Sequence, residues 1–173
     1  MNKIALIGSG GSGKSTLAKK LGQRLNLNVW HLDQLLWKPG WTPVSKKEQI
    51  KIQTELVTQE NWIIDGNYNS TLDIRLDAAD TIIFLDISRF ICVYRVFKRM
   101  LIFRNRTRPD MREGCNEKMN LEFLKWIWDY PKKKKPEVLM KIENLSNEKH
   151  IIILESPREV DQFLRRMEAV RQR

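Results

Sequence analysis

The sequence predicts a three-layer αβα fold of the α/β class, in which helices cover both faces of a five-stranded parallel sheet. Short apolar runs alternate with amphipathic helical stretches, the first apolar run leads into a glycine-rich turn, and hydrophobic residues make up 42% of the 173 residues. Strands that alternate with helices are typical of a parallel sheet, and a chain of this length fills one core. We therefore expect residues 1–173 to form a single domain.

Five apolar segments are the expected strands: residues 3–7, 28–32, 62–64, 81–85 and 150–154. Sites in parallel sheets lie at the carboxyl ends of the strands. The second, third and fourth strands are followed there by Asp33, Asp65 and Asp86. A carboxylate in that place needs a partner, and a bound cation is one such partner.

The expected helices are recognised by apolar periodicity and by their first residues. Residues 14–25 place leucines on one face, and residues 45–59 begin with Ser45 and Glu48 in the spacing of a capping box. Residues 157–170 begin with a proline, which is favourable in the first turn of a helix.

The turn after the first strand matches the phosphate-binding pattern G-x-x-x-x-G-K-[ST] and lies between a strand and a helix, as its mechanism requires. Its glycines let backbone N–H groups wrap around phosphate oxygens, and the start of the next helix adds positive charge. We expect Lys14 to act on the β- and γ-phosphates, Ser15 to ligate Mg²⁺ and Thr16 to contact the α-phosphate. The predicted nucleotide-binding residues are Gly8, Ser9, Gly10, Gly11, Ser12, Gly13, Lys14, Ser15 and Thr16.

This pattern predicts a P-loop NTPase, without by itself choosing among kinases, GTPases and other ATPases. No N-K-x-D string of the kind that GTPases carry follows the fourth strand, and motor ATPases need a longer chain. The sequence therefore favours a small phosphoryl-transfer enzyme that uses ATP and Mg²⁺.

Basic charge is concentrated in one third of the chain. The formal net charge is +10, and residues 89–141 contain 15 Lys and Arg against 6 Asp and Glu. Such a segment attracts polyanions, namely nucleotide phosphates, a phosphorylated metabolite or nucleic acid; the alternative is a solvated basic surface. The consecutive lysines at residues 132–135, bracketed by prolines, predict an exposed turn.

Arginines recur around Pro109 in a helix-breaking segment between two apolar helices. This pattern predicts a lid at about residues 104–118 that closes over the nucleotide, because arginine stays charged and binds two phosphate oxygens at once. We expect Arg104 and Arg108 to act in catalysis and Arg99, on the preceding helix, to bind the nucleotide. The alternative for these arginines is a solvated helix end.

Over essentially its full length the chain resembles adenylate-kinase-like P-loop kinases. Three strings, HLD at residues 31–33, WIIDGNY at residues 62–68 and RTRPDM at residues 106–111, resemble the bacterial family labelled DNA topology modulation protein. The resemblance implies a nucleoside-monophosphate-kinase-like fold with the sheet order 2-3-1-4-5. It also implies that Asp65 takes the place of the aspartate that organises Mg²⁺ in the D-G-F-P-R string of adenylate kinases.

The chain departs from that string directly after Asp65 and Gly66. Asn67 and Tyr68 replace Phe-Pro, and no arginine follows at once. We therefore expect Asn67 to lie on the substrate side and Arg75 to serve as the substitute contact for an anion.

Asp33 is the residue expected to serve the phosphoryl acceptor, as a base for an attacking hydroxyl or as a holder of metal-bound water. His31 precedes it by two residues and is expected on the same side of the strand, as a buried core residue. Trp37 and Trp41 flank the next loop, where they either stack on a base or sugar or pack onto the surface. The aromatic residues expected in the core are Trp30, Trp62, Phe123, Trp126 and Trp128.

Together these features predict an ATP- and Mg²⁺-dependent small-molecule kinase whose acceptor is a hydroxyl or a phosphate. Its adenine is expected between the lid and residues 155–158. The alternative is a nucleotide-binding protein that grips DNA through residues 89–141. No apolar run is long enough for a membrane span, we expect no signal peptide, and the spacing of Cys92 and Cys115 suits a reducing cytoplasm.

Overall fold

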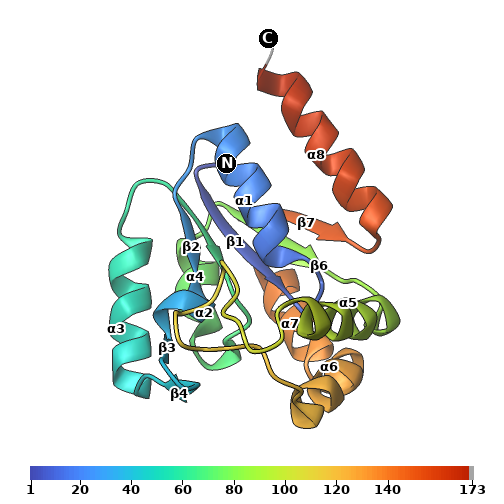
Figure 1. The fold of residues 1–173 in the computed structure, drawn as a ribbon. Helices are drawn as coiled ribbons and strands as arrows, with labels where there is room; N and C mark the ends of the chain where they lie inside the picture. Colours follow the sequence, from blue (N-terminus) through green and yellow to red (C-terminus); the bar gives the residue numbers. More distant parts are fainter. Residues whose placement is uncertain (172–173) are drawn as a thin grey trace.

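The computed structural model describes residues 1–171 and contains the expected parallel sheet (Figure 1). The strands of this sheet are β1 (Lys3–Gly8), β2 (Val29–His31), β5 (Trp62–Asp65), β6 (Thr81–Leu85) and β7 (His150–Leu154). They are ordered β2-β5-β1-β6-β7, and each neighbouring pair is parallel. Counted along the chain, this is the order 2-3-1-4-5, so the fold prediction is confirmed.

Helices pack on both faces of the sheet (Figure 1). Their bounds are α1 (Lys14–Leu25), α2 (Leu32–Leu35), α3 (Lys46–Val57), α4 (Leu72–Ala78), α5 (Arg89–Ile102), α6 (Leu121–Lys133), α7 (Lys135–Asn144) and α8 (Pro157–Arg171). A short 3₁₀ helix, η1 (Asn69–Thr71), precedes α4, and β3 (Trp37–Lys38) pairs with β4 (Thr42–Pro43) in an antiparallel hairpin.

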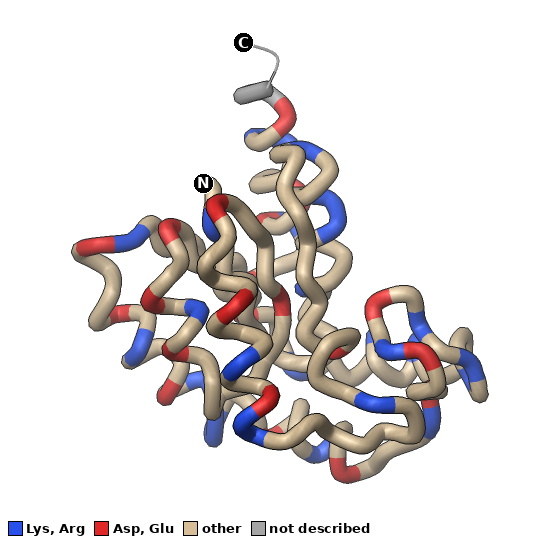
Figure 2. Tube along the Cα trace, turned by 90° about the vertical axis from the view of Figure 1, so that its left-hand side faces the viewer, with Lys and Arg blue, Asp and Glu red and all other residues tan. Residues whose placement is uncertain are grey.

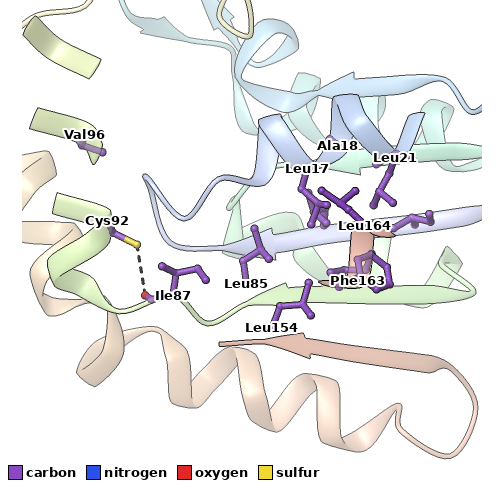
Figure 3. Packing of buried hydrophobic residues seen from close by; sticks show 14 of the residues in the cluster. Leu17, Ala18, Leu21, Leu85, Ile87, Cys92, Val96, Leu154, Phe163 and Leu164 are labelled. Atoms are coloured by element: carbon purple, nitrogen blue, oxygen red, sulfur yellow. Dashed lines mark hydrogen bonds between the residues drawn. The ribbon is translucent and has the colours of Figure 1, made fainter. Parts of the chain in front are cut away.

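The side chains of β1 alternate between two hydrophobic clusters, as the pleat of a strand requires. Ile4 and Leu6 lie in the cluster formed with α1, α5 and α8, whereas Ala5 and Ile7 lie in the cluster formed with α3, α4 and α7. Figure 3 shows the first cluster, in which the labelled residues of α1 and α8 pack over β6 and β7: Leu17, Leu21, Phe163, Leu164, Leu85 and Leu154. Burial on both faces explains why the central strands are apolar throughout.

One expectation about local structure was wrong, and a second was correct only in part. The second strand ends at His31 because Leu32 begins α2, so Asp33 lies on a helix and not at a strand end. The turn expected at residues 132–135 is confined to Lys134, because Lys133 ends α6 and Lys135 begins α7, a helix that periodicity did not reveal.

Of the aromatic residues expected in the core, Trp62 is fully buried and Trp128 is not, since 42% of Trp128 is exposed. Its ring lies on the surface beneath the guanidinium of Arg89, with 4.1 Å from Cζ to the ring centre. Among the described residues, no helix combines the length and apolarity needed to cross a bilayer.

Candidate active site

A cavity of about 910 Å³ lies at the carboxyl edge of the sheet. It is lined by the loop after β1, the residues that follow β2 and β5, one face of α5, the lid and the start of α6. A volume of this size is at the upper end of the range of small-molecule sites. The edge is the one at which parallel α/β sheets place their ligands.

The loop after β1 has the backbone conformation that a phosphate cradle needs. Gly13 caps α1 with a φ of 101°, in the region that favours glycine. At Gly11 a Cβ atom would lie 2.4 Å from the carbonyl oxygen of Cys92, so α5 packs directly against the loop. Arg95 of α5 donates from Nη1 to the carbonyl of Ser12 at 3.1 Å and fixes the loop from the same side.

The loop residues divide into those that face the cavity and those that support it. The lining residues are Gly10, Gly11, Gly13, Lys14, Ser15 and Thr16. Gly8 is buried against Leu85, and the hydroxyl groups of Ser9 and Ser12 are buried without a hydrogen-bond partner among residues 1–171. An orphaned buried hydroxyl is costly, and an anion held in the loop would give these groups a polar neighbour.

Lys14 bridges the loop and the acidic part of the cavity. Its Nζ donates to the carbonyl of Ser9 at 2.8 Å. Burial lowers the pKa of Lys14, and the carboxylates of Asp65 and Asp33 oppose that shift. The ammonium group of Lys14 therefore lies at the phosphate loop with two carboxylates nearby, those of Asp65 and Asp33.

Ser15 and Asp65, the two residues predicted for the metal, lie together. Ser15 donates from Oγ to Asp65 Oδ2 at 2.8 Å, and Nδ1 of buried His31 lies 2.6 Å from Oδ1 of the same carboxylate. Hydroxyl and carboxylate oxygens are the donors that Mg²⁺ prefers, so this pair fits the ion. His31 acts as a support for Asp65, and it does not share a strand face with Asp33, because α2 begins between them.

Asp33 is part of a directed hydrogen-bond chain. Trp37 donates from Nε1 to the hydroxyl of Tyr68 at 2.7 Å, and that hydroxyl donates to Asp33 Oδ1 at 2.8 Å. Oδ2 of Asp33 accepts no hydrogen bond from the described part of the chain. Burial raises the pKa of Asp33, as does Asp65, whereas Tyr68, Arg108 and Lys14 lower it. Tyr68 is a site residue that sequence analysis noted only as a departure from a family string.

Of the three arginines predicted to act on the phosphates, Arg108 of the lid and Arg99 of α5 lie in the cavity region, and Arg104 of the lid lies outside it. Arg108 and Arg99 line the cavity, and their Nε atoms lie 2.6 Å and 3.1 Å from Oε1 of buried Glu117. Arg104, predicted to be catalytic, is exposed and does not line the cavity, because its backbone forms a bridge with Glu117 at the outer edge of the lid. That assignment is therefore corrected.

Sequence analysis also missed the acidic residues of the lid. Asp110 lies 2.9 Å from Nη1 of Arg108. Burial is the largest single influence on the pKa of Asp110 and raises it, but Arg108, a backbone hydrogen bond, Ser15 and His31 together outweigh burial, so the pKa lies below its ordinary value. The lid thus brings its own carboxylates to the arginines and to the vicinity of the metal residues.

The lid is fastened to the β3–β4 hairpin on the other side of the cavity. Cys115 donates from Sγ to the carbonyl of Lys38 at 3.2 Å, Gly40 donates to the carbonyl of Gly114 at 3.0 Å, and Trp41 donates from Nε1 to that of Asn116 at 2.9 Å. These bonds hold residues 104–118 beside Trp37 and Trp41, which both line the cavity.

Arg75 does not serve the role predicted for it. It is fully buried, it is not part of the cavity lining, and burial lowers its pKa to about 10. Its guanidinium donates to the carbonyls of Gly66 at 2.9 Å and Tyr68 at 3.4 Å. Arg75 therefore shapes the loop after β5 from below, and Asn67 in that loop lines the cavity as expected.

Phe123 and Trp126, assigned to the core, are partly buried against it and also line the cavity, with rings stacked at 5.8 Å between centroids. They meet the loop closely, since a Cβ at Gly10 would lie 2.7 Å from Phe123. Residues 155–158, expected near adenine, are not among the lining residues.

No protein-family model matches the chain, and no curated protein matches it in sequence. Two solved structures of deoxyadenosine kinase from M. mycoides resemble its fold. The structure with the products dCMP and a flexible dCDP has a TM-score of 0.46 at 16% identity, over 96% of this chain and 98% of that chain. The structure with bound dCTP has the same TM-score and coverage at 14% identity. At these values the likeness carries no argument, and the assignment of the fold rests on the sheet order and the loop.

Proposed function

We propose that the chain is an ATP- and Mg²⁺-dependent phosphotransferase, a small-molecule kinase that moves the γ-phosphoryl group to a hydroxyl or phosphate acceptor. One observation carries the proposal. The loop that ends in Lys14 and Ser15 opens into the same cavity as Asp33, Arg99 and Arg108. A cradle for phosphates, cations for the transferring group and a carboxylate for an acceptor are the parts that phosphoryl transfer needs.

In this proposal the residues Gly8 to Thr16 hold the ATP phosphates. Lys14 exchanges the Ser9 carbonyl for phosphate oxygens, and Arg99 and Arg108 neutralise the charge that develops during transfer. Ser15 and Asp65 hold Mg²⁺, which when bound draws charge from the phosphate oxygens. His31 keeps Asp65 in place through the contact at 2.6 Å.

Asp33 receives the proton when the acceptor is a hydroxyl. The bond from the γ-phosphorus to the oxygen that bridges it to the β-phosphate breaks, and a bond from phosphorus to the acceptor oxygen forms. The hydroxyl proton passes to the Asp33 carboxylate, and ADP leaves. A base with a raised pKa suits this step, because its basicity is closer to what proton transfer at neutral pH requires.

The proposal includes a relationship to adenylate-kinase-like kinases and to the DNA topology modulation protein family, which the sequence resembles. The DNA-binding alternative has less support from the basic segment. Figure 2 shows acidic positions interspersed among the basic ones along the chain. Within residues 132–135, Lys133, Lys134 and Lys135 form ion pairs with Asp129, Glu137 and Asp86 at 2.6, 3.6 and 2.5 Å. A titration with duplex DNA at two salt concentrations tests the alternative, because phosphate-dominated binding weakens steeply with salt.

The proposal is tested with radiolabelled [γ-³²P]ATP, Mg²⁺ and a panel of nucleosides, nucleotides and sugars. We expect transfer to at least one acceptor and a loss of about 100-fold or more in the Lys14→Ala variant. Lys51→Ala, which removes an exposed lysine of α3, is the matched control and keeps full activity. A natural-sequence chain that neither hydrolyses ATP nor transfers phosphate would contradict the proposal.

A further inference from the structure

We infer that the acceptor is an uncharged hydroxyl compound with a flat ring, such as a nucleoside, and not a phosphate monoester. The inference rests on the proposed function and narrows its acceptor. It follows from an uneven distribution of charge in the cavity. We call the part of the lining contributed by residues 31–68 the acceptor wall; its members are His31, Asp33, Trp37, Trp41, Asp65, Gly66, Asn67 and Tyr68.

The acceptor wall contains carboxylates and aromatic rings but no lysine or arginine among the described lining residues. The cations of the cavity belong to the loop after β1, α1, α5, the lid and the segment leading to α6. Lys38, in the hairpin itself, is exposed and lies 3.9 Å from Glu48, away from the lining. The donor side of the cavity is thus cationic, and the acceptor wall is acidic and apolar.

The arginines nearest to the acceptor wall are already committed to other partners. Arg75 is fully buried beneath the wall and donates to the carbonyls of Gly66 and Tyr68. Arg108 lies between the carboxylates of Glu117 and Asp110, at 2.6 and 2.9 Å. These carboxylates hold Arg108 on the lid side of the cavity, where the proposed function uses it for the transferring phosphoryl group and not for the acceptor.

A phosphate monoester in this place would have to give up water beside like charges. The carboxylates of Asp33 and Asp65 both line the acceptor wall, and Asp65 already raises the pKa of Asp33. A phosphate dianion would add to that repulsion, and the lining residues of the acceptor wall include no lysine or arginine to bind it directly. A neutral hydroxyl, by contrast, needs only an acceptor for its proton, which Oδ2 of Asp33 supplies.

The rings of the wall indicate what carries the hydroxyl. Trp37 and Trp41 meet edge to face at 5.6 Å between centroids, and Tyr68 is bonded to Trp37 at 2.7 Å. Aromatic faces that are fixed in this way favour a flat ring over a flexible chain. The amide of Asn67 adds both a donor and an acceptor for polar atoms on the ring's edge.

The test compares nucleosides with their own 5′-monophosphates, and with hexoses and glycerol, as acceptors for [γ-³²P]ATP. We expect the best nucleoside to exceed its monophosphate by about tenfold or more in kcat/KM, since repulsion by a neighbouring like charge is typically worth about a factor of ten. A monophosphate that outperforms its nucleoside overturns the inference and leaves the proposed function standing. Transfer only to compounds without a flat ring, such as hexoses or glycerol, or ATP hydrolysis without transfer to any nucleoside, overturns it as well. If ATP neither binds nor is hydrolysed, the proposed function fails too.

A second measurement separates the ring from the hydrogen bond. Trp37→Ala is expected to raise KM for the preferred acceptor about fivefold while leaving KM for ATP unchanged. Trp37→Phe keeps a ring and recovers most of the loss. Trp128→Ala, at an exposed tryptophan outside the cavity, is the matched control. Equal kinetics in Trp37→Ala and the control would contradict the role of the ring, and the melting temperature of each variant shows that it is folded.

Discussion

Oε1 of Glu117 lies 2.6 Å from Nε of Arg108, and both side chains are buried within the lid. The same oxygen lies 3.1 Å from Nε of Arg99, which comes from α5. One carboxylate therefore joins the lid to the helix that precedes it. In the proposed mechanism, Glu117 positions both arginines for binding the phosphates. It is a positioning residue, since it acts through the arginines.

Replacing Glu117 by Gln removes the anion shared by buried Arg108 and partly buried Arg99, and leaves Arg108 with Asp110 alone. Removing one partner of a buried ion pair costs about 3–5 kcal/mol, and we expect a loss near the lower end in the free energy of unfolding measured in urea. A fall in kcat should accompany it. Glu113→Gln, at an exposed position of the same lid, is the control and should change neither quantity. A loss below about 0.5 kcal/mol, the range of ordinary surface changes, would show that Glu117 does not hold the arginines.

Asp33→Asn removes the proposed base while keeping the size of the side chain. We expect kcat to fall about 100-fold or more, as is usual when general-base catalysis is lost, and the affinity for ATP to stay within a few-fold of the unmodified chain. Single-turnover kinetics and calorimetry measure the two quantities. Asp73→Asn, whose carboxylate is on the surface, is the control. An unchanged kcat would remove Asp33 from the chemistry.

Tyr68→Phe tests the hydrogen bond to Asp33 through pH. Asp33 must be ionised to accept a proton, so the rate falls as pH drops through its pKa, which burial raises above the ordinary aspartate value. The bond from Tyr68 opposes that shift. Its removal raises the pKa further, and the acidic limb of the kcat/KM profile should move to higher pH. A limb that stays in place, or moves to lower pH, would contradict the hydrogen-bond chain.

Asp65→Asn weakens the acidic partner of Ser15. Residues that support a metal site typically change its affinity 10–100-fold, so we expect the Mg²⁺ concentration for half-maximal activity to rise about tenfold. Asp86→Asn is a matched control, because Asp86 directly follows β6 as Asp65 ends β5, but Asp86 pairs with Lys135 at 2.5 Å and lies outside the cavity. A larger effect in Asp86→Asn than in Asp65→Asn would reverse the assignment of the metal residue.

The sheet and the phosphate loop could be predicted because they depend on local patterns. Apolar runs such as residues 81–85 are buried on both faces, and β6 has the predicted bounds. Helix α1 also begins and ends where periodicity places it, because Gly13 and Asn26 cap it in left-handed conformations. Each of these features is set by residues that are neighbours in the chain.

The acceptor side and the lid could not be predicted in the same way, because they depend on contacts between distant segments. Tyr68 reaches Asp33 across 35 positions, and Cys115 reaches Lys38 across 77. The sequence shows that Arg75 and Arg104 are charged, but it does not show whether either side chain faces the cavity. Arg75 is drawn beneath the loop after β5 by two carbonyls, and Arg104 stays exposed at the edge of the lid.

Calorimetric titration of the purified chain with ATP in the presence of Mg²⁺ tests the central claim most directly. The account predicts saturable binding at one site per chain, weakened about tenfold or more in Lys14→Ala, because a charged hydrogen bond to phosphate is lost. A parallel titration with GTP shows whether the site distinguishes adenine from guanine. If neither triphosphate binds to the folded, unmodified chain, the loop after β1 is not a phosphate cradle and the account is wrong.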